Sequence, residues 1–202
     1  LTCALALLIS QQGKRVCVVE STTHEAIAPL MQTRPIGHRE TEILPEFFAL
    51  NVDKTRVIRD YMLHIFGREK IYRPLFENRV MASFFKTIPF LEELLILGRL
   101  YWMLESVRPR SYPVYDTVIF DAPPTGYSTN FLQTPFIMEQ ALGSGVLFDQ
   151  TRKIIGLIQD KTKTGLMLTC IPHRLSVNET MQLYHSIVQS NSIHLSGIVL
   201  NR

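Results

Sequence analysis

The stretch TVIFDAPPTG, residues 117–126, decides the fold. Its first four residues have strand character and three of them are strongly apolar, which predicts a strand buried on both faces, as in a parallel sheet. The strand ends at Asp121, and the prolines and glycine that follow break it into a turn. Because open α/β sheets bind ligands at the carboxyl ends of their strands, we expect Asp121 to belong to a ligand site.

The composition indicates one globular domain of modest charge. With 202 residues and 46% hydrophobic content, the chain can bury one sizeable core. The formal net charge of +3 is mildly basic, and Lys and Arg are scattered, so we expect no nucleic-acid partner. The apolar stretch 84–104 is interrupted by charged residues and a proline, so we expect no transmembrane segment.

The three cysteines lie far apart in the sequence, without a C-x-x-C pair; they are Cys3, Cys17 and Cys170. This usage fits the reducing cytosol and indicates neither a disulfide framework nor a zinc site. We therefore expect a cytoplasmic protein in which the three thiols are small buried apolar groups.

Strands and helices alternate along the chain, which predicts a doubly wound α/β fold with a mostly parallel sheet. Residues 53–110 have a helical pattern with proline breaks, and we expect a helical insertion between two strands of the sheet. Ser176 and Glu179 form a capping box, which predicts a helix that starts after Ser176 and runs to about Ser190. The other expected elements are helices at 1–12, 136–142 and 149–160 and strands at 15–20, 47–52, 165–170 and 196–201.

Four segments together resemble the arsenical-pump ATPase family, which includes the ATPases that target tail-anchored proteins. They are LTCALALL at 1–8, DAPPTG at 121–126, CIPHRLSVNET at 170–180 and GIVLNR at 197–202. The resemblance implies a P-loop NTPase-like fold, with ATP and Mg²⁺ as cofactors. It also implies a Walker A loop, GKGGxGKT, just before Leu1, whose backbone N–H groups and lysines would hold the phosphates. We therefore expect residues 1–202 to form a single domain that is incomplete at its N-terminus.

The resemblance implies nucleotide-site roles for three residues. Asp121 resembles the carboxylate that holds Mg²⁺ through water, Gly126 the glycine whose backbone N–H senses the terminal phosphate, and Asn201 the residue that bonds the adenine ring. The residues alone leave structural alternatives open. These are a solvated carboxylate at a strand end for Asp121, a turn residue for Gly126, and a strand-end cap for Asn201.

The loop after the strand at 15–20 departs from the family pattern. Many members carry S-T-D-P-A-H here, with the Asp positioning the attacking water, and Thr22 occupies the position of that Asp. A hydroxyl cannot serve as a carboxylate base. Glu20 is the catalytic candidate that could supply the missing charge, and the alternative is that its carboxylate is a structural hydrogen-bond acceptor. We expect hydrolysis to be slow unless a partner assists.

The resemblance also implies a homodimer and a client. The sequence lacks the C-x-x-C zinc clasp of the targeting ATPases, so a dimer would form without that metal, and it lacks the clustered thiolates that arsenite requires. The insertion contains apolar runs at 88–91, 94–97 and 100–104, more than one helix face needs. We expect either a groove for a hydrophobic client helix or a cover packed on its own subdomain and the sheet.

Together, these observations predict an ATPase that binds MgATP, hydrolyses it slowly and couples the nucleotide state to a conformational change. The first alternative is a nucleotide-binding switch without turnover, which Thr22 favours, whereas Asp121, Gly126 and Asn201 favour the enzyme. The second alternative is a partitioning or scaffold ATPase of the same superfamily. A basic stripe or a cysteine pair would indicate it, and the sequence has neither.

Overall fold

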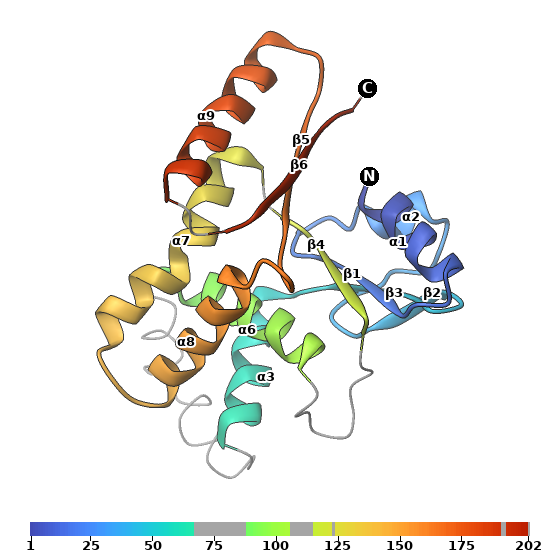
Figure 1. The fold of residues 1–202 in the computed structure, drawn as a ribbon. Helices are drawn as coiled ribbons and strands as arrows, with labels where there is room; N and C mark the ends of the chain where they lie inside the picture. The colour runs from blue at the N-terminus through green and yellow to red at the C-terminus, as the bar shows by residue number, and fades with distance from the viewer. Residues whose placement is uncertain (67–87, 106–114, 123, 191–192, 202) are drawn as a thin grey trace. The chain divides into compact units, whose positions relative to one another are not determined.

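The computed structural model describes residues 1–66, 88–105, 115–122, 124–190 and 193–201 (Figure 1). The chain divides into two compact units, Leu1–Ala122 and Pro123–Arg202, and each is described by itself. Strands alternate with helices and most strand pairs are parallel, which confirms the predicted α/β class. The single domain expected over residues 1–202 stays a prediction.

The first unit contains a mixed sheet flanked by helices (Figure 1). Its described elements are α1 (Thr2–Gln11), β1 (Val16–Glu20), α2 (Ile27–Leu30), β2 (Thr41–Leu44), β3 (Phe47–Asn51), α3 (Lys54–Phe66), α6 (Leu91–Leu104) and β4 (Thr117–Asp121).

β1 lies inside the sheet of the first unit. β3 and β4 both pair with it in parallel, and β2 pairs with β3 in the antiparallel direction, which gives the order β2-β3-β1-β4. All five residues of β1 are buried, which explains its continuous apolar run. β2 has no counterpart among the predicted strands, because its alternation of exposed and half-buried residues extends over only four positions.

β4 carries the stretch from which the fold was predicted, and it ends at Asp121 as expected. Its burial differs from the prediction, since residues 117–120 are half-buried and Asp121 is exposed. The physical reason is its position: among the described strands, β4 is at the end of the sheet and pairs only with β1. Burial on both faces is therefore wrong for β4.

α1 packs against β1, β3 and β4. Its Cys3 and Ala6 belong to one buried cluster with Val16 of β1 and Phe47 of β3. Gly13 follows the helix with a φ of 74°, the left-handed conformation that commonly ends helices. The predicted helix at 1–12 and its glycine stop are therefore confirmed.

The described part of the helical insertion consists of α3 and α6, while residues 67–87 and 106–114 lie outside the described residues. α3 begins where the sequence predicts, because Oδ1 of Asp53 accepts the N–H of Arg56 at 3.1 Å. The two helices pack through the ring of Tyr61, which stacks on Trp102 with ring centroids 4.7 Å apart.

The second unit contains three helices and two strands in its described residues. They are α7 (Thr125–Leu142), α8 (Val146–Gln159), β5 (Leu166–Cys170), α9 (Arg174–Ser190) and β6 (Leu195–Leu200). β5 and β6 form a parallel pair, and α9 packs against β5 (Figure 1). In the part of the chain that the structure describes, no helix combines the length and the apolarity needed to cross a membrane.

α7 begins eleven residues before the predicted helix at 136–142. The prediction starts after Pro135 because proline lacks an N–H and usually interrupts a helix. The structure accommodates Pro135 inside α7. Next to it, the hydroxyl of Thr134 donates a hydrogen bond of 2.9 Å to the carbonyl of Asn130, one turn earlier.

α9 begins two residues before Ser176, at Arg174, so the predicted N-cap role of Ser176 is wrong. Its hydroxyl lies within the first turn and accepts the N–H of Ile171 at 3.3 Å. The sequence pattern identified the helix correctly and misplaced its start, because this hydroxyl bonds the preceding loop rather than its own helix.

Candidate functional site

Three polar side chains end neighbouring strands at one edge of the first unit's sheet. The register pairs Glu20 of β1 with Asp121 of β4 on one side and with Asn51 of β3 on the other. All three strands run parallel, so these residues meet at the carboxyl edge, where open α/β sheets bind ligands. The structure therefore brings the predicted Asp121 and Glu20 together.

Glu20 is completely buried. Its Oε2 accepts the N–H of Ala26 at 3.0 Å, which holds the loop after β1, whereas its Oε1 has no hydrogen-bond partner among the described residues. Burial raises the pKa of Glu20, the N–H groups of Ala26 and Ile27 oppose this shift, and the charges of Glu25 and Asp121 add to it. One oxygen is thus structural, and the other is buried without a hydrogen-bond partner among the described residues.

Asp121 is exposed at the end of β4, yet loss of water around the carboxyl raises its pKa. Carboxylate oxygens are ligands that Mg²⁺ prefers, and Mg²⁺ keeps several waters besides one or two protein carboxylates. The described residues contain no cluster of three or more His, Cys, Asp or Glu side chains that could hold a metal ion. An exposed carboxylate beside a buried one with an orphaned oxygen fits a Mg²⁺ ion held largely by water and phosphate.

Thr22 lies in the exposed loop after β1. Its backbone is paired with the side chain of Asn51: the Thr22 N–H donates to Oδ1 at 3.2 Å, and Nδ2 donates to the Thr22 carbonyl at 3.0 Å. The Thr22 hydroxyl donates to the carbonyl of His24 at 2.8 Å. The position where family members carry Asp is therefore held by its backbone, and its hydroxyl is engaged within the loop.

Asn51 is a site residue that the sequence reasoning missed. The available signal was the one used for Asp121, a polar residue that ends a buried strand. The sequence could not show that Asn51 contacts Thr22, because the pairing of β3 with β1 decides which loop the Asn51 amide reaches.

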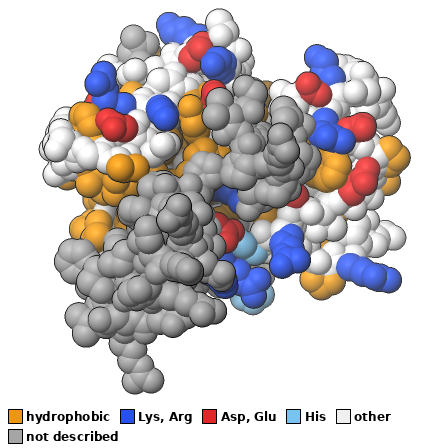
Figure 2. Space-filling view, turned by 90° about the horizontal axis from the view of Figure 1, so that it is seen from below, with side chains coloured by type: hydrophobic (Ala, Val, Ile, Leu, Met, Phe, Trp, Pro, Cys, Tyr) orange, Lys and Arg blue, Asp and Glu red, His pale blue; other side chains and the backbone are white. Residues whose placement is uncertain are grey.

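A pocket of about 780 Å³ opens beside the loop that carries Thr22, on the β3 side of β1. Both oxygens of Glu25 are engaged there, since they accept the N–H groups of Gly37 at 2.6 Å and Ile36 at 2.9 Å. In Figure 2, His side chains lie next to Lys, Arg, Asp and Glu side chains on the face shown. The pocket is lined by Ser21, Thr22, Thr23, Glu25, Gly37, His38, Asn51, Val52, Asp53, Lys54 and Arg56.

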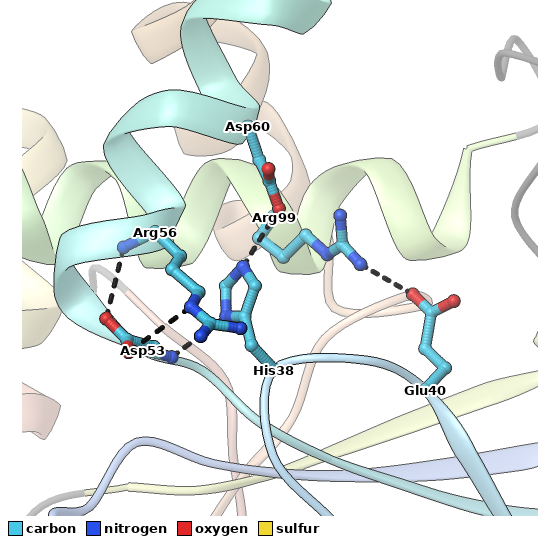
Figure 3. Close-up of polar contacts among 6 residues, drawn as sticks. All are labelled: His38, Glu40, Asp53, Arg56, Asp60 and Arg99. Atoms are coloured by element: carbon cyan, nitrogen blue, oxygen red, sulfur yellow. Dashed lines mark hydrogen bonds and ion pairs between the residues drawn. The ribbon is translucent and has the colours of Figure 1, made fainter.

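One lining residue, His38, connects this pocket to α3 (Figure 3). Its Nδ1 accepts the N–H of Asp53 at 2.9 Å, so its Nε2 carries the hydrogen and donates to Oδ2 of Asp60, also at 2.9 Å. Burial opposes the ionisation of Asp60, but the hydrogen bond from His38, with the charges of Arg99 and Arg59, outweighs it and lowers the pKa of Asp60. His38 thereby fixes the first turns of α3.

Gly126 and Asn201 belong to the second unit. Gly126 is the second residue of α7, and N–H groups at a helix N-terminus lack intrahelical partners, as a phosphate sensor requires. Asn201 follows β6, and its backbone N–H donates to the carbonyl of Cys170 at 2.7 Å. Their nucleotide-binding roles stay predictions.

The three cysteines are buried and free, as expected. Burial raises the pKa of the Cys3 and Cys17 thiols, which disfavours the thiolate form that binds soft metals. The apolar residues of α6 are also largely enclosed, among them Leu94, Leu95 and Ile96. Within α6, this burial favours the cover over the client groove.

A family model described as anion-transporting ATPase matches residues 1–151. The chain is similar to ATPase BagA of Mycobacterium tuberculosis, with 25% identity over 98% of this chain and 59% of the relative. It is also similar to ATPase ASNA1 homolog 1 of Paramecium tetraurelia, with 22% identity over 98% of this chain and 69% of the relative. ATPase get3 of Pyrenophora tritici-repentis is 24% identical over 100% of this chain and 68% of its own length. The chain thus spans about 59% of the length of the first of these relatives.

Proposed function

Since the chain belongs to the anion-transporting ATPase family, we propose that the protein binds MgATP at the edge formed by β1 and β4 and hydrolyses ATP slowly. The observation that carries this proposal is the register that pairs Glu20 with Asp121 at the carboxyl ends of neighbouring parallel strands. Strand ends of this kind are where α/β folds place the groups that act on a bound ligand.

Asp121 would hold Mg²⁺ through water. Its exposed carboxylate is accessible to a hydrated ion, and the ion's remaining positions would be filled by water and phosphate oxygens. When bound, Mg²⁺ offsets negative charge on the phosphate oxygens. The nearby carboxylate of Glu20 adds a second negative charge to this edge.

Glu20 would accept the proton of the attacking water on Oε1. This oxygen is buried and has no hydrogen-bond partner among the described residues, and the raised pKa of the carboxyl makes it a stronger base than an ordinary glutamate. Its other oxygen bonds the N–H of Ala26, which fixes the orientation of the carboxylate.

Hydrolysis would be slow because position 22 lacks a carboxylate. The Thr22 hydroxyl cannot act as a base, and it already donates to the carbonyl of His24. In the second unit, the N–H of Gly126 would bond the terminal phosphate and the side chain of Asn201 the adenine ring, as the family resemblance implies.

The nucleotide state would be coupled to a conformational change of the helical insertion, in a cytoplasmic homodimer. Only Val52 separates Asn51, at the end of β3, from Asp53, which caps α3. This short connection supports the proposed coupling between the sheet edge and the insertion. A hydrophobic client would require apolar surface beyond α6, whose apolar side chains are buried.

The alternative function is a nucleotide-binding switch without turnover. Thr22 favours it, because the position of the family's water-orienting Asp holds a hydroxyl that is engaged within its loop. The two functions use the same nucleotide-binding site and differ in whether Glu20 takes part in ATP hydrolysis.

A steady-state ATPase assay on the full-length protein tests the proposal. We expect turnover that stops when EDTA removes Mg²⁺. We expect Asp121→Asn and Glu20→Gln each to lower kcat by about 100-fold or more, since general-base and charge-stabilising groups contribute on this scale. Asp149→Asn, which changes an exposed carboxylate in the first turn of α8, is the matched control and should leave kcat unchanged.

Each other outcome has a definite meaning. Wild-type turnover in Glu20→Gln would remove Glu20 from the mechanism. Tight MgATP binding by the wild type without turnover would establish the switch instead of the enzyme. Absence of MgATP binding by the wild type would refute both functions.

A further inference from the structure

The side chain of Asn51 extends the sheet by one step beyond the last strand pair. β1 and β3 pair up to Glu20 and Asn51, and the next backbone bond runs from the N–H of Val52 to the carbonyl of Glu20 at 2.7 Å. The Asn51 amide then bonds both the N–H and the C=O of Thr22. A primary amide carries both donor N–H groups and an acceptor oxygen, so it can bond the N–H and the C=O of one residue as a neighbouring strand would.

This pairing fixes the loop at its most exposed point. The side chains of residues 22–24 are all exposed, so packing contributes little to their placement. Side-chain hydrogen bonds hold the loop at two points instead. Oε2 of Glu20 accepts the N–H of Ala26, and the Asn51 amide bonds the backbone of Thr22. The bond from Ala26 to Glu20 is partly buried, whereas the two bonds between Asn51 and Thr22 are exposed.

Asn51 also lies at the start of the helical insertion. Asp53, two residues later, caps α3 through the N–H of Arg56 and donates its own N–H to the ring of His38. Just before this cap, the backbone N–H of Asn51 donates to the carbonyl of Gly37 at 2.8 Å. A displacement of Thr22 that moves the Asn51 amide therefore acts on a segment that reaches the N-cap residue of α3, Asp53, within two residues.

We infer that Asn51 is a positioning residue that couples the loop around Thr22 to α3, so that a nucleotide bound beside this loop changes the order of the helical insertion through the Asn51 amide. The inference rests on the proposed function, because it needs a nucleotide at the β1–β4 edge. Asn51 touches no reacting atom and acts through the backbone of Thr22.

The test is hydrogen–deuterium exchange of the full-length protein, with and without MgADP, in the wild type and in Asn51→Asp. The substitution keeps the size and one acceptor oxygen, but it replaces the Nδ2 donor with an oxygen that faces the Thr22 carbonyl. Asn178→Asp, the same change at an exposed position of α9, is the control. Asn51→Ala, which removes both bonds without adding charge, serves if Asn51→Asp does not fold.

In the wild type and in Asn178→Asp, we expect MgADP to slow exchange at both residues 21–26 and residues 54–61. In Asn51→Asp we expect faster exchange at 21–26 and loss of the nucleotide-dependent change at 54–61. We also expect kcat to fall about 10-fold or more while KM changes less than about 3-fold, because misplacing a positioned group affects the chemical step more than binding.

A residue with a purely structural role would change the thermal stability and leave the nucleotide effect on α3 in place. A nucleotide effect at 54–61 that is equal in Asn51→Asp and the wild type would therefore overturn the inference, while the proposed function would stand. If the wild type binds neither MgADP nor MgATP, the proposed function fails and the inference falls with it.

Discussion

Arg99 of α6 and Glu40, the residue before β2, form an ion pair of 2.8 Å with only 5% and 9% of their side chains exposed (Figure 3). Burying two charges is costly, and their attraction offsets this cost only while both partners are present. The pair joins α6 to the segment that carries His38, and the charge of Arg99 also lowers the pKa of Asp60, the residue of α3 that His38 contacts.

Breaking this pair should destabilise the first unit strongly. We expect Arg99→Met to lower the free energy of unfolding by about 3–5 kcal/mol, because it leaves the Glu40 carboxylate buried without its partner. Urea denaturation measures this change. Arg152→Met removes one partner of the 3.5 Å pair with Glu139, whose side chains are 66% and 36% exposed, and should cost at most about 1 kcal/mol.

The double variant Arg99→Met with Glu40→Leu distinguishes the stability that the ion pair contributes from the stability that packing of the two side chains contributes. Replacing both charges by apolar groups should recover most of the loss, since a buried ion pair is often no more stabilising than a hydrophobic pair. Equal losses in the single and double variants would show that Arg99 acts through other contacts than Glu40.

Gly98 gives a second prediction about the helical insertion. A Cβ atom at this position would lie 2.6 Å from Cε2 of Tyr61, whose ring is 1% exposed and stacked on Trp102. The ring has little room to move, so we expect Gly98→Ala to lower the free energy of unfolding by about 1–3 kcal/mol.

Gly156→Ala is the matched control for Gly98→Ala. Gly156 also lies inside a helix, α8, but an added Cβ would meet no atom within 4 Å. There, alanine should raise the free energy of unfolding by about 0.5–1 kcal/mol through its higher helix propensity. Thermal melts of the two variants should shift in opposite directions, and shifts of the same sign would contradict the tight contact at Tyr61.

Comparison of the predicted and observed elements shows what local pattern can determine. β1, β3, β5 and β6 were predicted because each is a short apolar run that ends at polar or turn residues. β2 and α2 were missed because short elements of mixed polarity depend on their partners. The sequence TEIL becomes a strand at the edge of β3, and α2 starts where Glu20 accepts the N–H of Ala26.

The candidate site shows the same division between local and long-range information. The sequence identified Asp121 and Glu20 separately, each as a carboxylate that ends a strand. Their position side by side depends on the pairing of β1 with β4, which are about 100 residues apart, and no local pattern encodes that choice. Asn51 was missed for this reason, since its contact with Thr22 arises only when β3 lies next to β1.

The raised pKa of Glu20 predicts how stability depends on pH. Because the folded protein binds this proton more tightly than the unfolded chain, the carboxyl stabilises the fold below its ordinary pKa of 4.5 and loses that contribution as the pH rises through the raised pKa. Glu20→Gln stays neutral at every pH. We therefore expect the free energy of unfolding of the wild type to fall relative to Glu20→Gln as the pH rises above 4.5.

Urea denaturation at several pH values measures this difference. Glu42→Gln removes a charge at an exposed position of β2 in the same sheet and controls for the effect of net charge. A difference between wild type and Glu20→Gln that does not vary with pH would contradict the raised pKa.

Thr22 provides a prediction of gained activity. Its backbone is held by Asn51, so an aspartate at position 22 would occupy a fixed place where family members carry the carboxylate that positions the attacking water. We expect Thr22→Asp to raise kcat by about 10-fold or more, within the range that a positioned base contributes.

Thr23→Asp adds the same charge one residue further along the exposed loop and should not reproduce the gain. Placed in the Glu20→Gln background, Thr22→Asp should restore turnover, because the carboxylate at position 22 can then act on the water in place of the one removed at position 20. Equal rates for Thr22→Asp and Thr23→Asp would instead reveal an effect of loop charge, and position 22 would have no special role in hydrolysis.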